Sequence, residues 1–466
     1  MAASASIPKT VYLGTFVHCV SLSDLEISEK GAIGVDENGV IQFVEKNVDL
    51  AQVHEKHSDW KEAKVTELKG NSFFFPGFID THTHAPQHPN TGLFGKTTLL
   101  SWLETYTFPT ESSFSSLEKA SPIYTNFVSR TLSHGTTTCA YYATIHVPAT
   151  NLLADICLSR GQRALVGRVC MNSHSMSPDY YRDATLESAL ADSKASIDYI
   201  HSIDPQGDIV RPIVTPRFAP SCTAECLSAL GDLAKSHDAF IQTHISENLG
   251  EIELVKELFP KSESYTAVYD ETNLLTEKTI LAHAIHLDQK ERETIKARGA
   301  KISHCPASNT ALTSGCAPIR EYLDMGLTIG LGTDVSGGFS PSILEECRQA
   351  IWTSRFRAMG NGDDVKLSTQ EALYLATRGG AKVVGLEGKV GGFEVGMEWD
   401  AQMICLGEVA EGGEKEGVFE SGPVDVWGWE SMEDRVNKWV YSGDDRNCVA
   451  VWVRGRLVHK TAKFQG

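Results

Sequence analysis

Eight short apolar runs alternate with helix-length amphipathic segments through the middle of this chain, and this alternation constrains the fold more than any other feature. It is typical of parallel strands with helices packed outside them. The runs are Phe73–Asp80, Thr136–Ala143, Arg163–Val169, Val210–Arg217, Ala239–His244, Thr279–His283, Lys301–His304 and Thr328–Asp334. Eight β/α units over roughly 300 residues predict an α/β fold, a (β/α)8 barrel of the TIM type.

The two ends of the chain have strand-like patterns instead. Ile33–Val44 fits a hairpin with Asn38 and Gly39 in its tight turn, a turn that requires positive φ at both central positions. Val449–Val458 fits a second hairpin that folds at Arg454-Gly455. We therefore expect the two flanks to share one small β-sandwich domain.

These patterns divide the chain into three parts. Residues 1–75 and 391–466 are expected to form the β-sandwich, and residues 76–390 the catalytic barrel. Residues 407–430 are rich in Gly and Glu and lack periodicity, so we expect an exposed acidic insertion within the C-terminal flank.

Charge and cysteine content narrow the class of protein. A formal net charge of −18 argues against a broad nucleic-acid surface. No stretch approaches the roughly 20 apolar residues of a membrane span, and the N-terminus lacks the pattern of a secretion signal. Eleven cysteines without dense spacing predict reduced thiols. We expect a cytoplasmic protein with no nucleic-acid or membrane partner.

The first apolar run leads into His82-Thr83-His84. Side chains two positions apart on a strand point to the same side, so both imidazoles would enter the mouth of the barrel together. This arrangement predicts a metal-binding pair, although an isolated His-x-His motif also occurs without a metal.

Other predicted strands end in the same kind of residue. His244 closes the fifth run, His283 the sixth and Asp334 the eighth, all at the end where barrel active sites form. Imidazole and carboxylate ligands suit Zn²⁺ or Fe²⁺, and a catalytic site keeps a position for water. Glu247, three residues beyond His244, is placed to carry protons.

The end of the fourth run distinguishes between kinds of metal site. It offers no lysine that could be carboxylated to bridge two ions, which favours a single metal. Arg217 stands there instead and presents a planar fork of donors that matches the O6/N7 edge of a purine. The chain also lacks the His-Glu-x-x-His motif and the signature of the small zinc deaminases.

Longer motifs extend over nearly the whole chain. They are PGFIDTHTHAPQ (76–87), SWLETYTFPTE (101–111), HGTTTCAYYATIH (134–146), VTPRF (214–218), QTHISEN (242–248), HCPASN (304–309), LGTDVSGGFSPSIL (331–344) and GDDRN (443–447). With these motifs the sequence resembles the amidohydrolase superfamily and, within it, the enzymes that deaminate guanine. The superfamily motif Gly-Lys-x-Ala-Asp appears in altered form as Gly396-Met-Glu-Trp-Asp400, away from the expected site.

The resemblance implies zinc-dependent hydrolysis of guanine to xanthine and ammonia by a homodimer, with one Zn²⁺ per chain. The implied metal ligands are His82, His84, His244 and Asp334. The implied catalytic residues are Glu247, Asp334 and His283, the last as a hydrogen-bonding group beside the metal. The implied substrate contacts are His84, Gln87, Arg217, Phe218, His244, Glu247 and Asp334.

Two other functions stay open. The first is an aminohydrolase of the same fold that acts on another amino-substituted heterocycle, such as 8-oxoguanine, a pterin or a triazine. Gln87 and Arg217 argue for guanine, because a pocket built to hydrogen-bond one edge rejects analogues that lack it. The second is a non-catalytic barrel scaffold, and the presence of all five expected metal-site residues argues against it.

Overall fold

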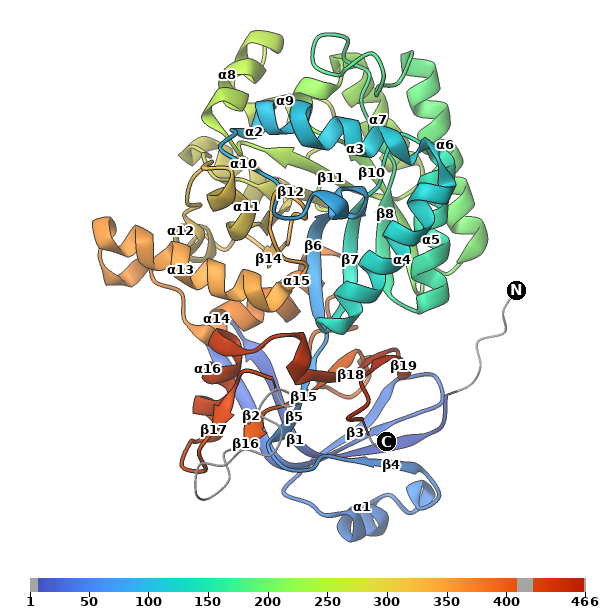
Figure 1. Ribbon diagram of the computed structural model, residues 1–466, viewed down its shortest axis with the longest axis vertical. Helices are drawn as coiled ribbons and strands as arrows, with labels where there is room; N and C mark the ends of the chain where they lie inside the picture. Colours follow the sequence, from blue (N-terminus) through green and yellow to red (C-terminus); the bar gives the residue numbers. More distant parts are fainter. Residues whose placement is uncertain (1–6, 409–421, 465–466) are drawn as a thin grey trace.

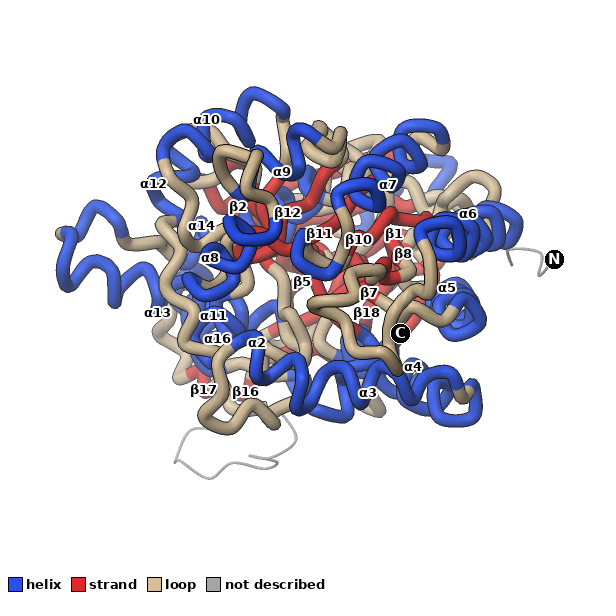
Figure 2. The backbone as a smooth tube through the Cα atoms, turned by 90° about the horizontal axis from the view of Figure 1, so that it is seen from above, coloured by secondary structure: helices blue, strands red, loops and turns tan. Residues whose placement is uncertain are grey.

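The computed structural model describes residues 7–408 and 422–464. Figure 1 shows a body of strands surrounded by helices and, below it, a smaller β-rich part that contains the strands nearest both ends of the chain. Seen from above in Figure 2, the strands lie at the centre and the helices around them. The predicted α/β barrel fold is confirmed.

Eight parallel strands form the barrel, in the spatial order of their sequence. They are β6 (Phe78–His84), β7 (Thr136–Tyr142), β8 (Arg163–Gly167), β10 (Val210–Pro216), β11 (Phe240–Ile245), β12 (Thr279–His283), β13 (Lys301–His304) and β14 (Ile329–Leu331), with β9 (Val169–Cys170) beside β10. Backbone hydrogen bonds join the first and last strands: Asp334 N donates to the His82 carbonyl at 2.8 Å, and His84 N to the Val335 carbonyl at 3.1 Å. These bonds bring the ends of β6 and β14 together at the mouth.

Helices cover the outside of the barrel. They are α4 (Leu117–Ser133), α5 (Val147–Arg160), α6 (Leu186–Ile203), α7 (Ala224–Ser236), α8 (Leu249–Leu258), α9 (Tyr265–Glu271), α10 (Gln289–Arg298), α11 (Pro306–Ala311), α12 (Ile319–Asp324), α13 (Ile343–Asn361), α14 (Thr369–Tyr374) and α15 (Gly380–Val383). Local sequence sets their ends: α10 begins with the capping box of Asp288 and stops at Gly299, whose φ of 71° suits glycine.

An insertion between β6 and β7 lies over the mouth. It contains η2 (Ala85–Asn90), α2 (Leu99–Trp102), η3 (Leu103–Thr107), α3 (Phe108–Ser112) and η4 (Ser113–Ser115). The remaining short turns are η1 (Ser58–Trp60), η5 (Ala219–Ser221), η6 (Asp363–Val365), η7 (Leu375–Gly379) and η8 (Asp445–Asn447).

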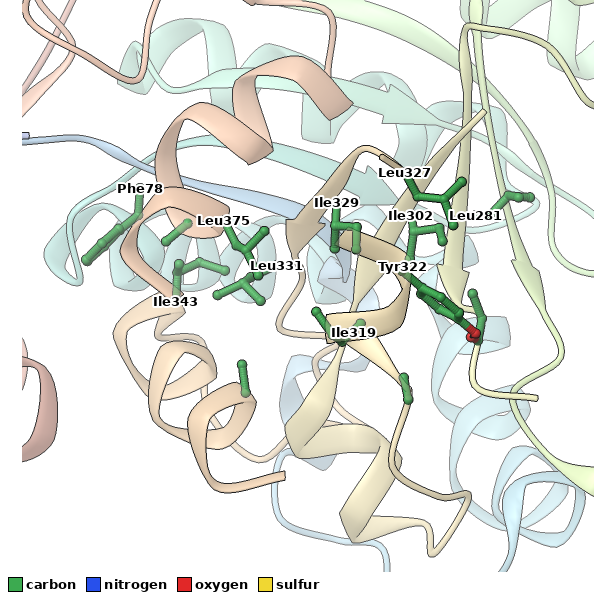
Figure 3. Packing of buried hydrophobic residues seen from close by; sticks show 14 of the residues in the cluster. Phe78, Leu281, Ile302, Ile319, Tyr322, Leu327, Ile329, Leu331, Ile343 and Leu375 are labelled. Atoms are coloured by element: carbon green, nitrogen blue, oxygen red, sulfur yellow. The ribbon is translucent and has the colours of Figure 1, made fainter. Parts of the chain in front are cut away.

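Buried apolar side chains pack between the barrel strands and the outer helices and hold the strand ends in place. Figure 3 shows buried side chains of β13 and β14, among them Ile302 and Leu331, clustered with Ile319 and Tyr322 of α12. The Tyr322 hydroxyl donates to the carbonyl of Ala284, the residue after β12, at 2.7 Å. Packing of α12 therefore also fixes the chain where a candidate site residue, His283, ends its strand.

The prediction of one barrel strand at Phe73–Asp80 is wrong. Gly77 divides the run into β5 (Ser72–Pro76), which pairs with β1 and β15 in the lower sheet, and β6 in the barrel. A Cβ at Gly77 would lie 2.2 Å from the Thr137 side chain, so only glycine permits this close crossing. Because both halves are apolar, hydropathy alone did not reveal the change of sheet.

Strands from both flanks pair in the smaller part and form one eight-stranded sheet. Its strands are β1 (Thr10–Ser21), β2 (Asp24–Val35), β3 (Ile41–Lys46), β4 (Lys64–Glu67), β5, β15 (Ala401–Cys405), β18 (Cys448–Val453) and β19 (Arg456–Lys460), accompanied by α1 (Leu50–Lys56) and α16 (Met432–Ser442). Aromatic side chains fill its core, where Tyr12 stacks on Trp399 with ring centroids 4.2 Å apart and Phe74 meets Trp399 edge-on.

The two predicted hairpins differ in their turns. Arg454 and Gly455 both have positive φ, as expected of a two-residue turn. At the other hairpin only Gly39 does, and the expectation for Asn38 is wrong. Asp36 causes the difference, because its side chain accepts from the N–H groups of Asn38 and Val40 and stabilises a three-residue loop.

The predicted acidic insertion at 407–430 falls largely on residues 409–421, which lie outside the described residues. The flanking part contains β16 (Gly407–Glu408) paired with β17 (Asp425–Val426). Val424 and Val426 are buried, so the expectation of an exposed, irregular segment is wrong for them. Their apolar side chains pack on the core that also includes Trp439 of α16.

Two observations bear on the expected environment of the protein. None of the helices within the described ranges has the length and apolar content needed to cross a bilayer. All eleven cysteines fall within those ranges and none forms a disulfide.

Candidate active site

The strand ends place five predicted residues around one point at the mouth of the barrel. His82 and His84 end β6, His244 lies near the end of β11, His283 ends β12 and Asp334 follows β14. One ligand atom from each of His82, His244, His283 and Asp334 lies within 4.8 Å of the others. His84 joins them, with its Nε2 3.2 Å from His244 Nε2 and 3.3 Å from Asp334 Oδ1.

Hydrogen bonds on the far side of two of the imidazoles fix their orientation. His244 Nδ1 lies 2.6 Å from the Arg217 carbonyl, and His283 Nδ1 lies 2.8 Å from Asn309 Oδ1. In each case the other nitrogen, Nε2, faces the centre of the cluster. Partners of this kind select the tautomer that a metal-ligating histidine needs. Asn309 was missed by sequence reasoning, although it lies in the quoted motif HCPASN.

A buried carboxylate supports the cluster from behind. Asp80 accepts hydrogen bonds from His82 N and from the backbone N and hydroxyl of Thr333. It therefore connects the end of β6 to the segment that carries Asp334. Burial raises the pKa of Asp80 to about 7.

The protonation states of the cluster suit a divalent cation. Burial lowers the pKa of His84 to about 4 and that of His244 well below its ordinary value, so both are neutral at pH 7. Burial opposes ionisation of Asp334, but the neighbouring His82 and His84 hold its pKa well below the usual range. Neutral imidazoles and an ionised carboxylate are the forms that bind metals.

An unpaired buried atom supports the same conclusion. Among the described residues, His283 Nε2 faces the cluster and is buried without a hydrogen-bond partner. Buried polar atoms in native proteins nearly always have one, so such atoms mark a position for a bound group. The donor set of this cluster therefore fits a zinc-like metal.

Glu247 lies beside the cluster, just before the N-cap Asn248 of α8. Its Oε2 is 3.4 Å from His283 Nε2, and Ser314 donates to its Oε1 at 3.3 Å. Its backbone N–H donates to Glu251 at 2.9 Å, which fixes the turn. Burial, with Glu251 and Asp334 nearby, raises the pKa of Glu247 well above its ordinary value. A protonated carboxyl group can deliver a proton at neutral pH.

A pocket opens next to these groups and encloses about 380 Å³, its open mouth included. Its apolar walls are Leu99, Trp102, Leu103, Phe218 and Leu312, and its polar lining includes Gln87, Arg217 and Glu247. The shape and lining suit a small heterocycle that is held by a few polar groups.

Arg217 and Gln87 meet at a carboxylate that sequence reasoning missed. Arg217 Nη1 and Nη2 lie 2.7 and 3.1 Å from the two oxygens of Glu111, and Gln87 Nε2 donates to Glu111 at 2.8 Å. Glu111 lies on α3 of the insertion and is fully buried. It stands in the motif TFPTE, so a signal existed, but nothing in the sequence connected it with Arg217.

Together these groups can perform one kind of chemistry. The His/Asp cluster can hold a metal, Glu247 can move protons, and the Arg217–Gln87 edge can bind hydrogen-bond acceptors on a flat ring. The arrangement fits the hydrolysis of a polar bond on a heterocycle.

Comparisons with known proteins agree with this arrangement. The model of the amidohydrolase family matches residues 73–458. A probable guanine deaminase of Schizosaccharomyces pombe is 49% identical over 96% of this chain and 83% of its own length. The guanine deaminase of Dictyostelium discoideum is 43% identical over 96% of this chain and 98% of its own.

A solved structure is also similar over nearly the full length. It is the crystal structure of a guanine deaminase from C. acetobutylicum with guanine bound in the active site. The two chains are 32% identical, and the match covers 97% of this chain and 100% of that one with a TM-score of 0.86.

Proposed function

The chain belongs to the amidohydrolase family, and on that premise we propose that it acts as a guanine deaminase, converting guanine and water into xanthine and ammonia. The observation that carries the proposal is one pocket in which the Arg217–Gln87 donor edge faces the His/Asp cluster and Glu247. The guanine bound to the related C. acetobutylicum enzyme supports the same substrate.

We assign one Zn²⁺ per chain to His82, His84, His244 and Asp334. The close approach of their ligand atoms and the neutral imidazoles support this assignment. His283, held by Asn309, serves as the hydrogen-bonding group beside the metal. When bound, zinc supplies the Lewis acidity that makes water a nucleophile near neutral pH.

The chain's own residues move the protons. Asp334 takes a proton from the attacking water, whose oxygen adds to C2 of guanine. Glu247 gives its proton to the adjacent ring nitrogen. The ionised Glu247 then takes the proton of the new C2 hydroxyl and passes it to the 2-amino group, so the C2–N bond breaks, ammonia leaves and C2 becomes a carbonyl. The proton held by Asp334 restores the protonated Glu247 for the next turnover. Ring protonation is needed because attack at C2 interrupts the delocalisation of the purine, and the raised pKa of Glu247 keeps this proton available.

The pocket orients the base for this reaction. The slot between Phe218 and the insertion holds the flat ring, and the N–H groups of Arg217 and Gln87 bind its acceptor atoms. His84 and His244 contribute to the floor below the reacting carbon.

A paired measurement on one preparation tests the function. Elemental analysis is expected to find about one zinc per chain, and ammonia release is expected with guanine in strong preference to adenine, cytosine and 8-oxoguanine. Chelation should abolish turnover and zinc should restore it. A preference for another heterocycle would contradict the assigned substrate, and a metal-free chain without turnover would indicate the scaffold.

The same proposal includes a cytoplasmic homodimer. The unpaired cysteines support a reducing compartment. Exposed apolar side chains on α13, namely Trp352, Phe356 and Met359, offer a surface for a second copy. Light scattering of the purified protein would give the mass of the assembly, and a monomer would contradict this part.

A further inference from the structure

We infer that Glu111 is the positioning residue that sets specificity at C6 of the purine, because it orients the Gln87 amide so that Gln87 and Arg217 together form an edge that only donates hydrogen bonds. This inference rests on the proposed function and deepens it. It assigns a role to a residue that touches neither the metal cluster nor the reacting carbon but holds both side chains expected to bind the base.

The carboxylate of Glu111 is saturated with donors. Its Oε1 accepts from Arg217 Nη2 at 3.1 Å and from Gln87 Nε2 at 2.8 Å. Its Oε2 accepts from Arg217 Nη1 at 2.7 Å and from the Tyr181 hydroxyl at 2.7 Å. Arg217, Gln87, Tyr181 and Glu111 are all buried. Each oxygen thus uses two acceptor positions, and the group has little freedom to turn.

The hydrogen bond from Gln87 to Glu111 fixes the direction of the Gln87 amide. Its Oε1 faces the backbone N and hydroxyl of Ser336, at 3.3 and 3.4 Å, while its Nε2 faces Glu111. Reversing the amide would place its oxygen against a carboxylate, which has no hydrogen to donate. The amide nitrogen therefore keeps one N–H for the pocket and presents no oxygen there.

Arg217 also keeps N–H groups that are not bonded to Glu111, and it lines the pocket. Glu111 takes one N–H from each terminal nitrogen, and within the described residues the guanidinium makes no other hydrogen bond. Its face lies over Phe108 at 5.4 Å, which restricts it further. Burial opposes ionisation of Glu111, but Arg217 holds its pKa below the ordinary value, so the pair stays ionised and the carboxylate never becomes a donor.

A donor-only edge discriminates between substituents at C6. A 6-oxo purine such as guanine presents acceptors at O6 and N7. These atoms accept hydrogen bonds from the free N–H groups of Arg217 and Gln87. A 6-amino purine turns N–H groups toward the same donors and leaves them buried and unpaired, which weakens binding strongly. Without the charge of Glu111, the Gln87 amide could reverse and accept a hydrogen bond.

Three substrates with the same 2-amino group isolate this effect. Guanine, 2-aminopurine and 2,6-diaminopurine carry an oxygen, a hydrogen and an amino group at C6. Ammonia release by the zinc-loaded wild type is expected to favour guanine over 2,6-diaminopurine by about 10³-fold or more in kcat/KM. In Glu111→Gln this ratio should fall at least about tenfold, through a higher KM for guanine at a kcat within about threefold of wild type.

A matched variant controls for lost stability. Glu398→Gln makes the same chemical change in another buried arginine pair, Arg163 with Glu398, at the opposite end of the barrel. Its substrate ratio and KM should equal those of wild type. Tyr181→Phe removes one of the four donors to Glu111 and should shift the ratio in the same direction by about two- to fivefold.

The outcomes separate the two proposals. A wild type that releases no ammonia from guanine contradicts the proposed function. A wild type that does so, alongside a folded, zinc-loaded Glu111→Gln with unchanged KM and ratio, overturns the role of Glu111. If Glu111→Gln does not fold, Tyr181→Phe decides, and an unchanged ratio in that variant overturns the role equally.

Discussion

The two ends of the barrel each contain a buried arginine paired with carboxylates, and they use it differently. At the start of β8, Arg163 donates to both oxygens of Asp400, to the Asp208 carbonyl and to Glu398. At the end of β10, Arg217 makes only the two bonds to Glu111 within the described residues. The first arginine is nearly saturated, and the second keeps donors for the pocket.

The difference shows that residue type and burial do not decide whether a charged cluster serves stability or function. What decides is the number of polar atoms left without a partner. Arg163 joins the barrel to the smaller sheet, since Asp400 also accepts from the backbone N of Arg454 at 2.7 Å. At the mouth, Arg217 makes hydrogen bonds only to Glu111 within the described residues, and His283 Nε2 is buried and unpaired. Barrel folds commonly divide stability and catalysis between their two ends in this way.

The largest expected effect belongs to the mouth. Glu247→Gln keeps the shape but removes the proton that is delivered to the ring, so kcat should fall about 10²–10⁴-fold. Zinc content and thermal stability should stay at wild-type values, because the variant removes a buried carboxyl group rather than a structural pair. Stopped assays of ammonia release with elemental analysis would check this, and a kcat near wild type would remove Glu247 from the mechanism.

The opposite end should show the reverse result. Arg163→Met leaves Asp400 buried without its cation, whereas Glu398 keeps Lys389 at 3.2 Å, and the loss should cost about 3–5 kcal/mol of unfolding free energy. Denaturant unfolding measures the loss. The kcat/KM of the protein that remains folded should stay within about threefold of wild type, since no contact of Arg163 reaches the pocket. A variant with unchanged stability but impaired catalysis would contradict the view that the Arg163 end serves stability and the mouth serves catalysis.

The smallest effect is a shift in pH dependence. Glu251 contributes to the raised pKa of Glu247, and activity requires the protonated form of Glu247, so the rate falls as pH rises through that pKa. Glu251→Gln lowers this pKa and should move the alkaline limb of the kcat profile to lower pH by about one unit. The backbone N–H of Glu247 and the Tyr265 hydroxyl can still hydrogen-bond the glutamine.

A second capping residue provides the control for this shift. Glu291 is a buried carboxylate at the equivalent position of α10, where it accepts from the backbone N of Asp288 at 3.0 Å. Glu291→Gln changes a helix cap without changing the charge beside Glu247, so its alkaline limb should not move. Equal shifts in both variants would attribute the effect to the cap.

Sequence reasoning succeeded where the signal was local. The alternation of apolar runs predicted the number of barrel strands and located all but the first of them, and the residues at the ends of the runs predicted which side chains meet at the mouth. It failed where contacts join distant segments. Glu111 and Arg217 lie far apart in the chain, and α3, which carries Glu111, is a short helix without amphipathic periodicity. The division of Phe73–Asp80 at Gly77 is also invisible to hydropathy, because both sheets bury their strands.

The joining of the two flanks in one sheet has a consequence for synthesis on the ribosome. Phe74 of β5 lies opposite Met403 of β15, so the strands made first wait for partners that emerge near the end of translation. Until then the nascent chain exposes an apolar strand edge, the kind of surface that aggregates or recruits chaperones. Arg163 likewise lacks Asp400 during that interval, so the contact that joins the barrel to the smaller sheet forms only after the last barrel strand has been made.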